Sequence, residues 1–361
     1  MDKRYEFWDI LKGIGIFSIV LGHCCPPAAI YVYSFHLALF FFTSAYFYNE
    51  DKYGRKPFLY VGNLLKNNWT KYVFYSTVLL LLQNFSVRFA LDYGSNYLGI
   101  YEMFNSFATS FIFNSQIKFA GAMWFVLPNI LSCALLCGLT GLSLRAVSPF
   151  KVKYSKFIRY AVMLLISGVL AYLAKTQLIF NIQVCFIVLP ICVTAYIIKS
   201  LAGFEISEYL KIYIAVPLCA LLYILVKYKN LQVELAQNIV PGIWFYVLSF
   251  CGIYVCMYLS KVLTKIPFIS KVVAFCGKYS FSIMALHFLV IKLCDRVYTF
   301  AIGEKNPAII GKWVCSYPEK LWPVYLIAGT IIPALAGYLF NKFKNYAQNN
   351  LPVCISTPTD E

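Results

Sequence analysis

Long apolar runs that carry no charge constrain this chain more than any other feature of its sequence. Segments 30–48, 121–144, 178–198, 239–260 and 321–341 contain no Asp, Glu, Lys or Arg. An α-helix needs roughly 17 to 25 apolar residues to cross a bilayer. Hydrophobic residues make up 61% of the 361 residues and charged residues only 13%, whereas soluble domains carry about 25% charged residues. The sequence therefore predicts an integral membrane protein.

The same hydropathy pattern predicts an all-α, polytopic helical bundle with about ten spans. A short stretch at 100–116 is apolar but rich in Asn and Ser, which favours an interfacial or re-entrant piece. We expect one membrane domain over residues 1–345, no large soluble domain, and a polar cytoplasmic tail over 346–361. The expected spans lie near 9–24, 30–48, 71–91, 121–144, 157–175, 178–199, 210–227, 239–260, 277–296 and 321–343.

The distribution of basic residues indicates how the bundle is oriented. The net charge is +16, and with ten spans and an inner N-terminus the inner segments hold 20 Lys and Arg against 10 in the outer segments. Because Lys and Arg favour cytoplasmic loops, we expect both termini inside and inner loops at 49–71 and 145–159. Short basic clusters between apolar runs are not the pattern of a nucleic-acid-binding face, so no nucleic-acid partner is expected.

The cysteines point to packing rather than to metal or redox chemistry. Most of the thirteen lie inside apolar runs, where Cys acts as a small apolar side chain. The sequence has no CxxC pair, and it has no Walker loop, Rossmann fingerprint or metal-ligand cluster. We therefore expect no bound metal.

The chain has three histidines, His23, His36 and His287, and all lie in or at the edge of expected spans. Ionisable groups in lipid cost roughly 2.5–3.5 kcal/mol on insertion scales, so those that persist usually have a task. One interpretation is that each histidine only joins two helices by hydrogen bonds. The other is that they act in catalysis, which their shared placement favours.

The first expected span places Lys12 and His23 on one helical face. Eleven residues are close to three turns, so the two side chains point the same way and lie about 16 Å apart along the axis. Gly13, Gly15 and Gly22 permit close approach of a neighbouring helix or ligand. The alternative is an ordinary ion pair between Asp9 and Lys12 at the membrane rim.

The first span resembles the first helix of the acyltransferase-3 family, in which an acidic residue precedes Arg or Lys, and ten residues separate that basic residue from a His. Here these positions are Asp9, Lys12 and His23. The next span, with His36 ahead of an aromatic run, is similar to the family's second helix. It has Ala38 where Pro is common and Ala45 where Gly is common.

Two later segments are also similar to family elements, so the resemblance extends over residues 4–290. GAMWFVLPNIL matches the family's Trp-Phe-Leu element through Trp124 and Phe125, and GKYSFSIMALHFLVI matches its late helix, ending at His287. In pattern the chain resembles the sugar and polysaccharide O-acetylases of the fucose 4-O-acetylase type. Residues 145–270 show hydropathy but no motif.

The resemblance implies transfer of an acyl group, with acetyl-CoA or another acyl-CoA as the cytoplasmic donor. The acceptor would be a hydroxyl of a cell-surface glycan or lipid-linked sugar at a bacterial cytoplasmic membrane. His23 is the expected general base, since a pKa near 6.5 suits that role at neutral pH. His36 would position the acceptor or stabilise the oxyanion, Lys12 would contact CoA, and Trp124 and His287 would bind substrate.

The connection at 24–29 bears on this arrangement. Pro26 and Pro27 are expected to stop the first helix and form a compact outer turn. His23 and His36 would then face one cavity open to the outside.

The alternative function is a transporter or flippase of a small substrate, with the histidines as a proton relay. It predicts inverted repeats or broken helices in matching halves, and the sequence shows neither.

Overall fold

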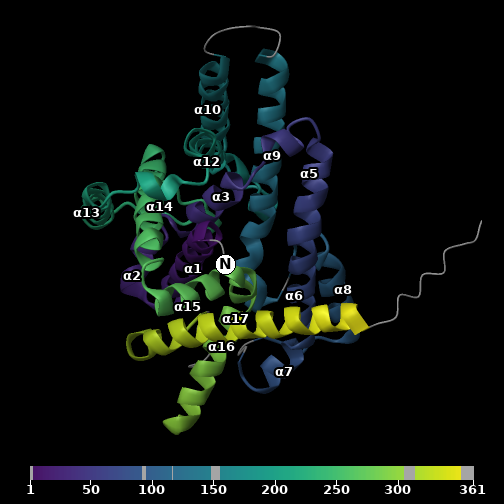
Figure 1. Cartoon of the computed structure of the whole chain (residues 1–361). Helices are drawn as coiled ribbons and strands as arrows, with labels where there is room; N and C mark the ends of the chain where they lie inside the picture. The colour runs from purple at the N-terminus through teal and green to yellow at the C-terminus, as the bar shows by residue number, and fades with distance from the viewer. Residues whose placement is uncertain (1–2, 92–94, 116, 148–154, 305–313, 351–361) are drawn as a thin grey trace, which may run out of the picture.

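The computed structural model describes residues 3–91, 95–115, 117–147, 155–304 and 314–350, and these residues form helices without a β-strand. The predicted all-α membrane bundle is therefore confirmed (Figure 1). In chain order the helices are α1 (Lys3–Cys24), α2 (Pro26–Val32), α3 (His36–Tyr46), α4 (Glu50–Tyr53), α5 (Pro57–Leu64), η1 (Leu65–Trp69), α6 (Thr70–Leu81), α7 (Gln83–Arg88), α8 (Ile100–Ser110), η2 (Lys118–Phe125), α9 (Val126–Val147), α10 (Ser155–Leu173), η3 (Ile179–Asn181), α11 (Gln183–Ile187), α12 (Leu189–Ala202), η4 (Ile206–Tyr209), α13 (Ile212–Tyr228), η5 (Leu235–Gln237), α14 (Ile243–Leu263), α15 (Pro267–Lys278), α16 (Ser280–Ala301) and α17 (Pro318–Asn350).

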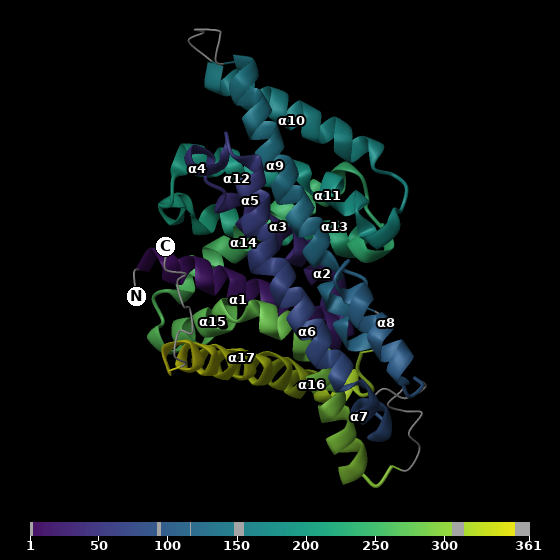
Figure 2. The same cartoon turned by 90° about the vertical axis from the view of Figure 1, so that its right-hand side faces the viewer.

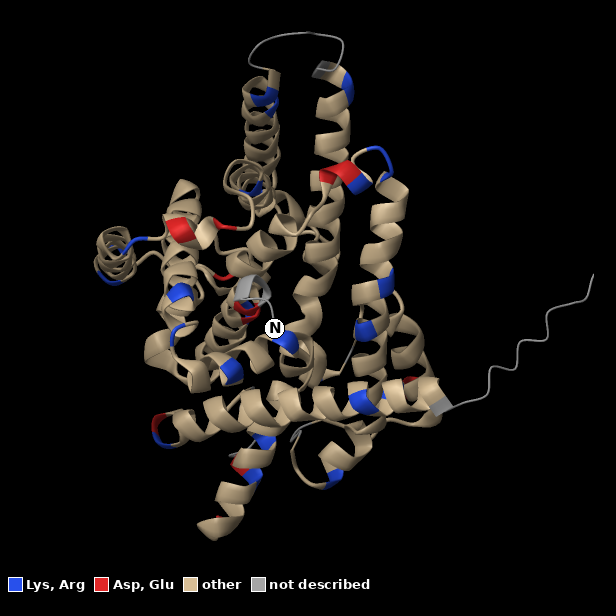
Figure 3. Cartoon of the chain, viewed as in Figure 1, with Lys and Arg blue, Asp and Glu red and all other residues tan. Residues whose placement is uncertain are grey.

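Helix α1 lies at the centre of the bundle because it contributes to both apolar clusters of the interior. Its first turns, with Trp8 and Leu11, pack into a cluster with α3, α12 and α14. Its later turns, with Ile16 and Val20, pack into a second cluster with α6, α9 and α16. In Figure 2, α1, α15 and α17 lie side by side as one layer. Long stretches of helix carry no charged residue (Figure 3), as expected for a bundle surrounded by lipid.

Six helices among the described residues are long and apolar enough to cross a bilayer, or up to eight when each of two bent pairs counts as one span. The bent pairs are η3–α11 with α12, at 44°, and α15 with α16, at 86°. Hydropathy alone did not reveal either break. Helix α13, expected as a span at 210–227, is apolar but shorter than these six.

The predicted third span, 71–91, is wrong in its bounds. The helix instead begins at Pro57 and runs through α5, the π-helical turn η1 and α6 to Leu81. Hydropathy treats Lys66 and Lys71 as loop residues. In the fold they lie within a continuous helix, and Lys71 lines a cavity rather than facing lipid. The predicted inner loop at 49–71 is therefore largely helical.

The connection after α1 is also tighter than the expected turn at 24–29. Cys25 alone separates the two helices, and Pro26 begins α2. Proline suits the first helical position because an N–H at that position would have no hydrogen-bond partner within the helix. The expected span at 30–48 is in turn divided at residues 33–35, so that α3 begins at His36.

Close contacts of glycine fix α15 across the first half of α1. A Cβ on Gly277 would overlap the carbonyl oxygen of Asp9, and one on Gly13 would overlap Val273. The expectation that Gly13 permits close helix approach is confirmed. This crossing places Lys278, at the end of α15, beside the Lys12 region of α1.

Both described ends of the chain lie at the same end of the bundle. Trp322, near the start of α17, approaches the end of α1, where its carbonyl oxygen accepts from the Cys24 thiol at 3.7 Å. Helix α17 therefore runs antiparallel to α1, and it finishes on the side where α1 begins (Figure 2). It extends through the boundary predicted at 345 as far as Asn350. The rest of the expected tail lies outside the described residues.

Candidate functional site

Two cavities follow one another along α1. The first, called here the lysine cavity, has a volume of about 290 Å³ and is lined by Lys12, Lys71 and Lys278. The second, the histidine cavity, has a volume of about 220 Å³ and is lined by His23 and His36. The ring of Phe125 lines both, so a single aromatic side chain lies at their junction.

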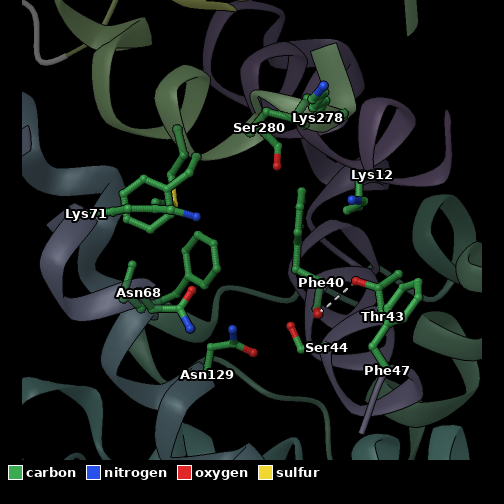
Figure 4. Close-up of a pocket in the computed structure, with 16 residues that line it drawn as sticks. Lys12, Phe40, Thr43, Ser44, Phe47, Asn68, Lys71, Asn129, Lys278 and Ser280 are labelled. Atoms are coloured by element: carbon green, nitrogen blue, oxygen red, sulfur yellow. Dashed lines mark hydrogen bonds between the residues drawn. The ribbon is translucent and has the colours of Figure 1, made fainter. Parts of the chain in front are cut away.

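The lysine cavity combines cations with uncharged hydrogen-bonding groups. Lys71 and the amides of Asn68 and Asn129 extend into it from one side, while Lys12 enters from α1 (Figure 4). The Lys12 ammonium pairs with Asp9 at 2.6 Å and its side chain is 32% exposed. Lys12 and Lys71 are near enough for their charges to repel. No acidic residue is among the described residues that line the cavity.

Local structure explains how Lys71 reaches this cavity. A π-helical turn holds one more residue than an α-helical turn, and such turns occur often at functional sites. The π turn η1 directly precedes α6, on which Lys71 lies, and it contains Asn68. The Lys71 ammonium also lies 5.7 Å from the centre of the Phe281 ring, which lines the same cavity.

The histidine cavity brings together residues that are far apart in the sequence. His23 comes from the end of α1, His36 from the start of α3 and Trp124 from η2. His23 and His36 line one cavity, as expected, and its opening to the outer side stays a prediction. Tyr33 and Glu234 line it as well, and neither was singled out from the sequence.

Hydrogen bonds define which imidazole nitrogens remain available. Nδ1 of His36 lies 2.7 Å from the carbonyl oxygen of Val32, so it carries a proton and donates. Nδ1 of His23 lies 3.2 Å from the Tyr33 hydroxyl. If His23 donates to Tyr33 through Nδ1, its Nε2 holds a free lone pair. That is the tautomer that a general base requires.

His287 is fully buried and does not line the histidine cavity among the described residues. Its ring stacks on that of His23 with centroids 5.4 Å apart. Its Nδ1 donates to the carbonyl oxygens of Ile283 and Met284, at 2.9 and 3.0 Å. Its Nε2 is buried and has no hydrogen-bond partner in the described part of the chain. The structure therefore places His287 behind His23, and its role in substrate binding stays a prediction.

A buried polar cluster supports the far side of His23. The Asp295 carboxylate is fully buried and accepts hydrogen bonds from Lys292, at 3.1 Å, from the Ser316 hydroxyl, at 2.8 Å, and from Tyr325. Next to Ser316, the Cys315 thiol donates to the carbonyl oxygen of His23 at 3.5 Å. The cluster thus ties the segment before α17 to the end of α1. Charged residues inside an apolar run, Lys292 and Asp295, were the one sign of this cluster in the sequence.

Comparison with known proteins supplies the family. A family model described as "Acyltransferase domain", of the acyltransferase-3 type, matches residues 5–342. Searches of curated proteins and of solved structures returned no significant match. The family match covers nearly the whole chain and favours acyl transfer over the transporter or flippase interpretation. The chain therefore belongs to the acyltransferase-3 family of membrane acyltransferases.

Proposed function

We propose that this protein transfers an acyl group, in the first instance acetyl, from cytoplasmic acyl-CoA to a hydroxyl of an envelope glycan on the opposite side of the membrane. One observation carries the proposal. Lys12 and His23 lie on the same helix and line two cavities that meet at Phe125. A donor held by its phosphates at Lys12 would extend its thioester along α1 towards His23, over about 16 Å.

The lysine cavity suits the nucleotide end of the donor. CoA carries several phosphates, and ammonium groups bind phosphate as point charges. Lys12, Lys71 and Lys278 supply such groups, and Asn68 and Asn129 add neutral donors. The proposal places this cavity on the cytoplasmic side, in keeping with the inner location expected for both termini.

The histidine cavity suits the transfer step. Nε2 of His23 takes the proton from the acceptor hydroxyl, and the oxygen attacks the thioester carbonyl. The C–O bond forms and the C–S bond breaks, so that CoA leaves as a thiolate that receives the proton from His23. A base of this kind contributes about 10²–10⁴-fold in rate. His36 lines the same cavity. Because its Nδ1–H is bonded to the Val32 carbonyl oxygen, Nε2 of the neutral ring is an acceptor, so His36 is the proposed partner of a hydroxyl of the acceptor; stabilising the oxyanion would require the ring to be protonated at both nitrogens.

The test uses purified protein in lipid nanodiscs with acetyl-CoA labelled in its acetyl group and a panel of glycans. We expect labelled ester in the wild type and loss of at least 100-fold in turnover in His23→Ala. Thermal unfolding followed by tryptophan fluorescence controls for folding. A folded His23→Ala protein with wild-type turnover would contradict the role of His23, and transfer to none of the glycans would contradict the proposed acceptor.

A further inference from the structure

The segment between α13 and α14 carries a carboxylate into the histidine cavity. Val233, Glu234, Leu235 and Ala236 all line this cavity. They lie on the side of the bundle where α1 ends, because α14 returns from this segment towards the start of α1, where the Ser260 hydroxyl donates to the Phe7 carbonyl at 2.6 Å.

The backbone around Glu234 is well anchored. Glu234 and Ile239 exchange two backbone hydrogen bonds, at 2.8 and 2.9 Å, which close a short hairpin. Val233 and Leu235, on either side of Glu234, are each 3% exposed and belong to the first apolar cluster. Asn238 adds a side-chain bond to the carbonyl oxygen of Lys175 at 2.9 Å. The carboxylate is therefore held at the cavity by a packed backbone.

The two cavities have opposite charge. Glu234 is the one Asp, Glu, Lys or Arg residue among the described residues that line the histidine cavity. The lysine cavity has three lysines and no acidic lining residue among those described. The Glu234 carboxylate accepts one hydrogen bond within its own segment, from the Gln237 amide at 2.9 Å. This bond uses only part of the accepting capacity of the carboxylate, because an ionised carboxylate has about four acceptor sites.

We propose that Glu234 selects the acceptor: it accepts hydrogen bonds from hydroxyls of a neutral sugar residue and excludes sugars that carry a carboxylate or phosphate beside the reacting hydroxyl. This inference rests on the proposed function. A carboxylate that faces hydroxyl donors forms charge-assisted hydrogen bonds, which are about twice as strong as neutral ones. The same charge repels an anionic acceptor, and such repulsion sets specificity.

The experiment compares methyl glucoside with methyl glucuronoside, which differ by a carboxylate, as acceptors for the protein in nanodiscs with labelled acetyl-CoA. We expect the wild type to favour the neutral sugar by about tenfold in kcat/KM. Glu234→Gln should raise KM for the neutral sugar, leave KM for acetyl-CoA unchanged and reduce the discrimination between the two sugars towards one.

Gln237→Ala is the matched control, because it removes the hydrogen bond within the segment but keeps the carboxylate. We expect it to keep the wild-type preference. If Glu234→Gln keeps that preference, or if Gln237→Ala loses it equally, the carboxylate is only structural and the inference is overturned. Transfer to neither sugar overturns the acceptor class. When neither sugar is acetylated, hydrolysis of acetyl-CoA that depends on His23 would show that the protein still uses the proposed donor. Absence of this hydrolysis would contradict the proposed function as well.

Discussion

Removing Lys12 or Lys71 from the lysine cavity should weaken donor binding only through the contacts of the donor phosphates. A hydrogen bond to a charged group is worth about 1.5–3 kcal/mol. Lys12 is 32% exposed, so solvent screening favours the lower end of this range. About 1.5 kcal/mol corresponds to roughly a tenfold change in affinity. We therefore expect Lys12→Ala and Lys71→Ala each to raise KM for acetyl-CoA about tenfold.

Both rises should be about tenfold, and that of Lys12→Ala should be the larger of the two. Its ammonium pairs with Asp9 at 2.6 Å, so its removal leaves an uncompensated carboxylate near the phosphates. Lys12→Arg keeps the positive charge and should retain most of the donor affinity. The double variant Lys12→Ala/Lys71→Ala should show more than either single change, since the two cations lie close together and act on one ligand.

The assay measures initial rates with acetyl-CoA and with acetyl-pantetheine, which lacks the nucleotide and its phosphates. The lysine variants should change KM for acetyl-CoA and leave that for acetyl-pantetheine at the wild-type value. Lys52→Ala is the control, because Lys52 is exposed on α4 and does not line the cavity. An equal rise in KM for both donors, or the same effect in Lys52→Ala, would refute phosphate binding at this cavity.

Three further predictions follow from the geometry. His36→Gln keeps a side chain that can donate to the Val32 carbonyl oxygen, so a structural role predicts near-normal turnover; we expect instead a fall of at least tenfold in kcat with unfolding temperature unchanged. Gly277→Ala should lower stability by about 1–3 kcal/mol in thermal unfolding, because the new Cβ would overlap the Asp9 carbonyl. Gly138→Ala is the control, because a Cβ at Gly138 has open space around it. Equal stability of the Gly277→Ala and Gly138→Ala variants would contradict the crossing of α15 and α1. A cysteine at Lys229, on the side where α1 ends, should react with an impermeant maleimide added outside cells, whereas one at Lys52 should not; the reverse labelling would invert the proposed orientation.

Much of the fold could be predicted because the bilayer imposes simple rules on composition. Runs without charge gave α9, α14 and α17 nearly in place. The helix from Pro57 to Leu81 was missed because two lysines in its middle read as a loop. Tertiary packing determines that this segment is helical, because a lysine that lines a polar cavity avoids the cost of facing lipid. The breaks in the bent pairs have the same origin, because neighbouring helices fix them and hydropathy does not.

The candidate site was predictable where chemistry is concentrated in single helices. The alignment of Lys12 and His23 follows from helical periodicity, and their two cavities follow one another along α1 as that alignment suggested. Tyr33, Lys71 and Glu234 come from a turn, a helix with a π turn and a hairpin. Only the three-dimensional arrangement brings them to the cavities, so no pattern within their own segments could have identified them.

The π turn between α5 and α6 makes this wall of the lysine cavity tolerant of a shorter chain at one place. Each residue of an α-helix turns the chain by about 100°. Deletion of one residue in α5, for example Val61, would therefore rotate Lys71 and Tyr75 by this angle against the start of the helix, and Tyr75 would lose its bond to Ser282 at 2.5 Å. The turn η1 already holds one residue more than an α-helical turn, so deletion of Asn67 would convert it to an α-helical turn and leave the two halves nearly in phase. A scan of substitutions would leave Asn67 looking unimportant, whereas a scan of single-residue deletions would identify η1 as the place where the helix can lose a residue and keep the cavity wall.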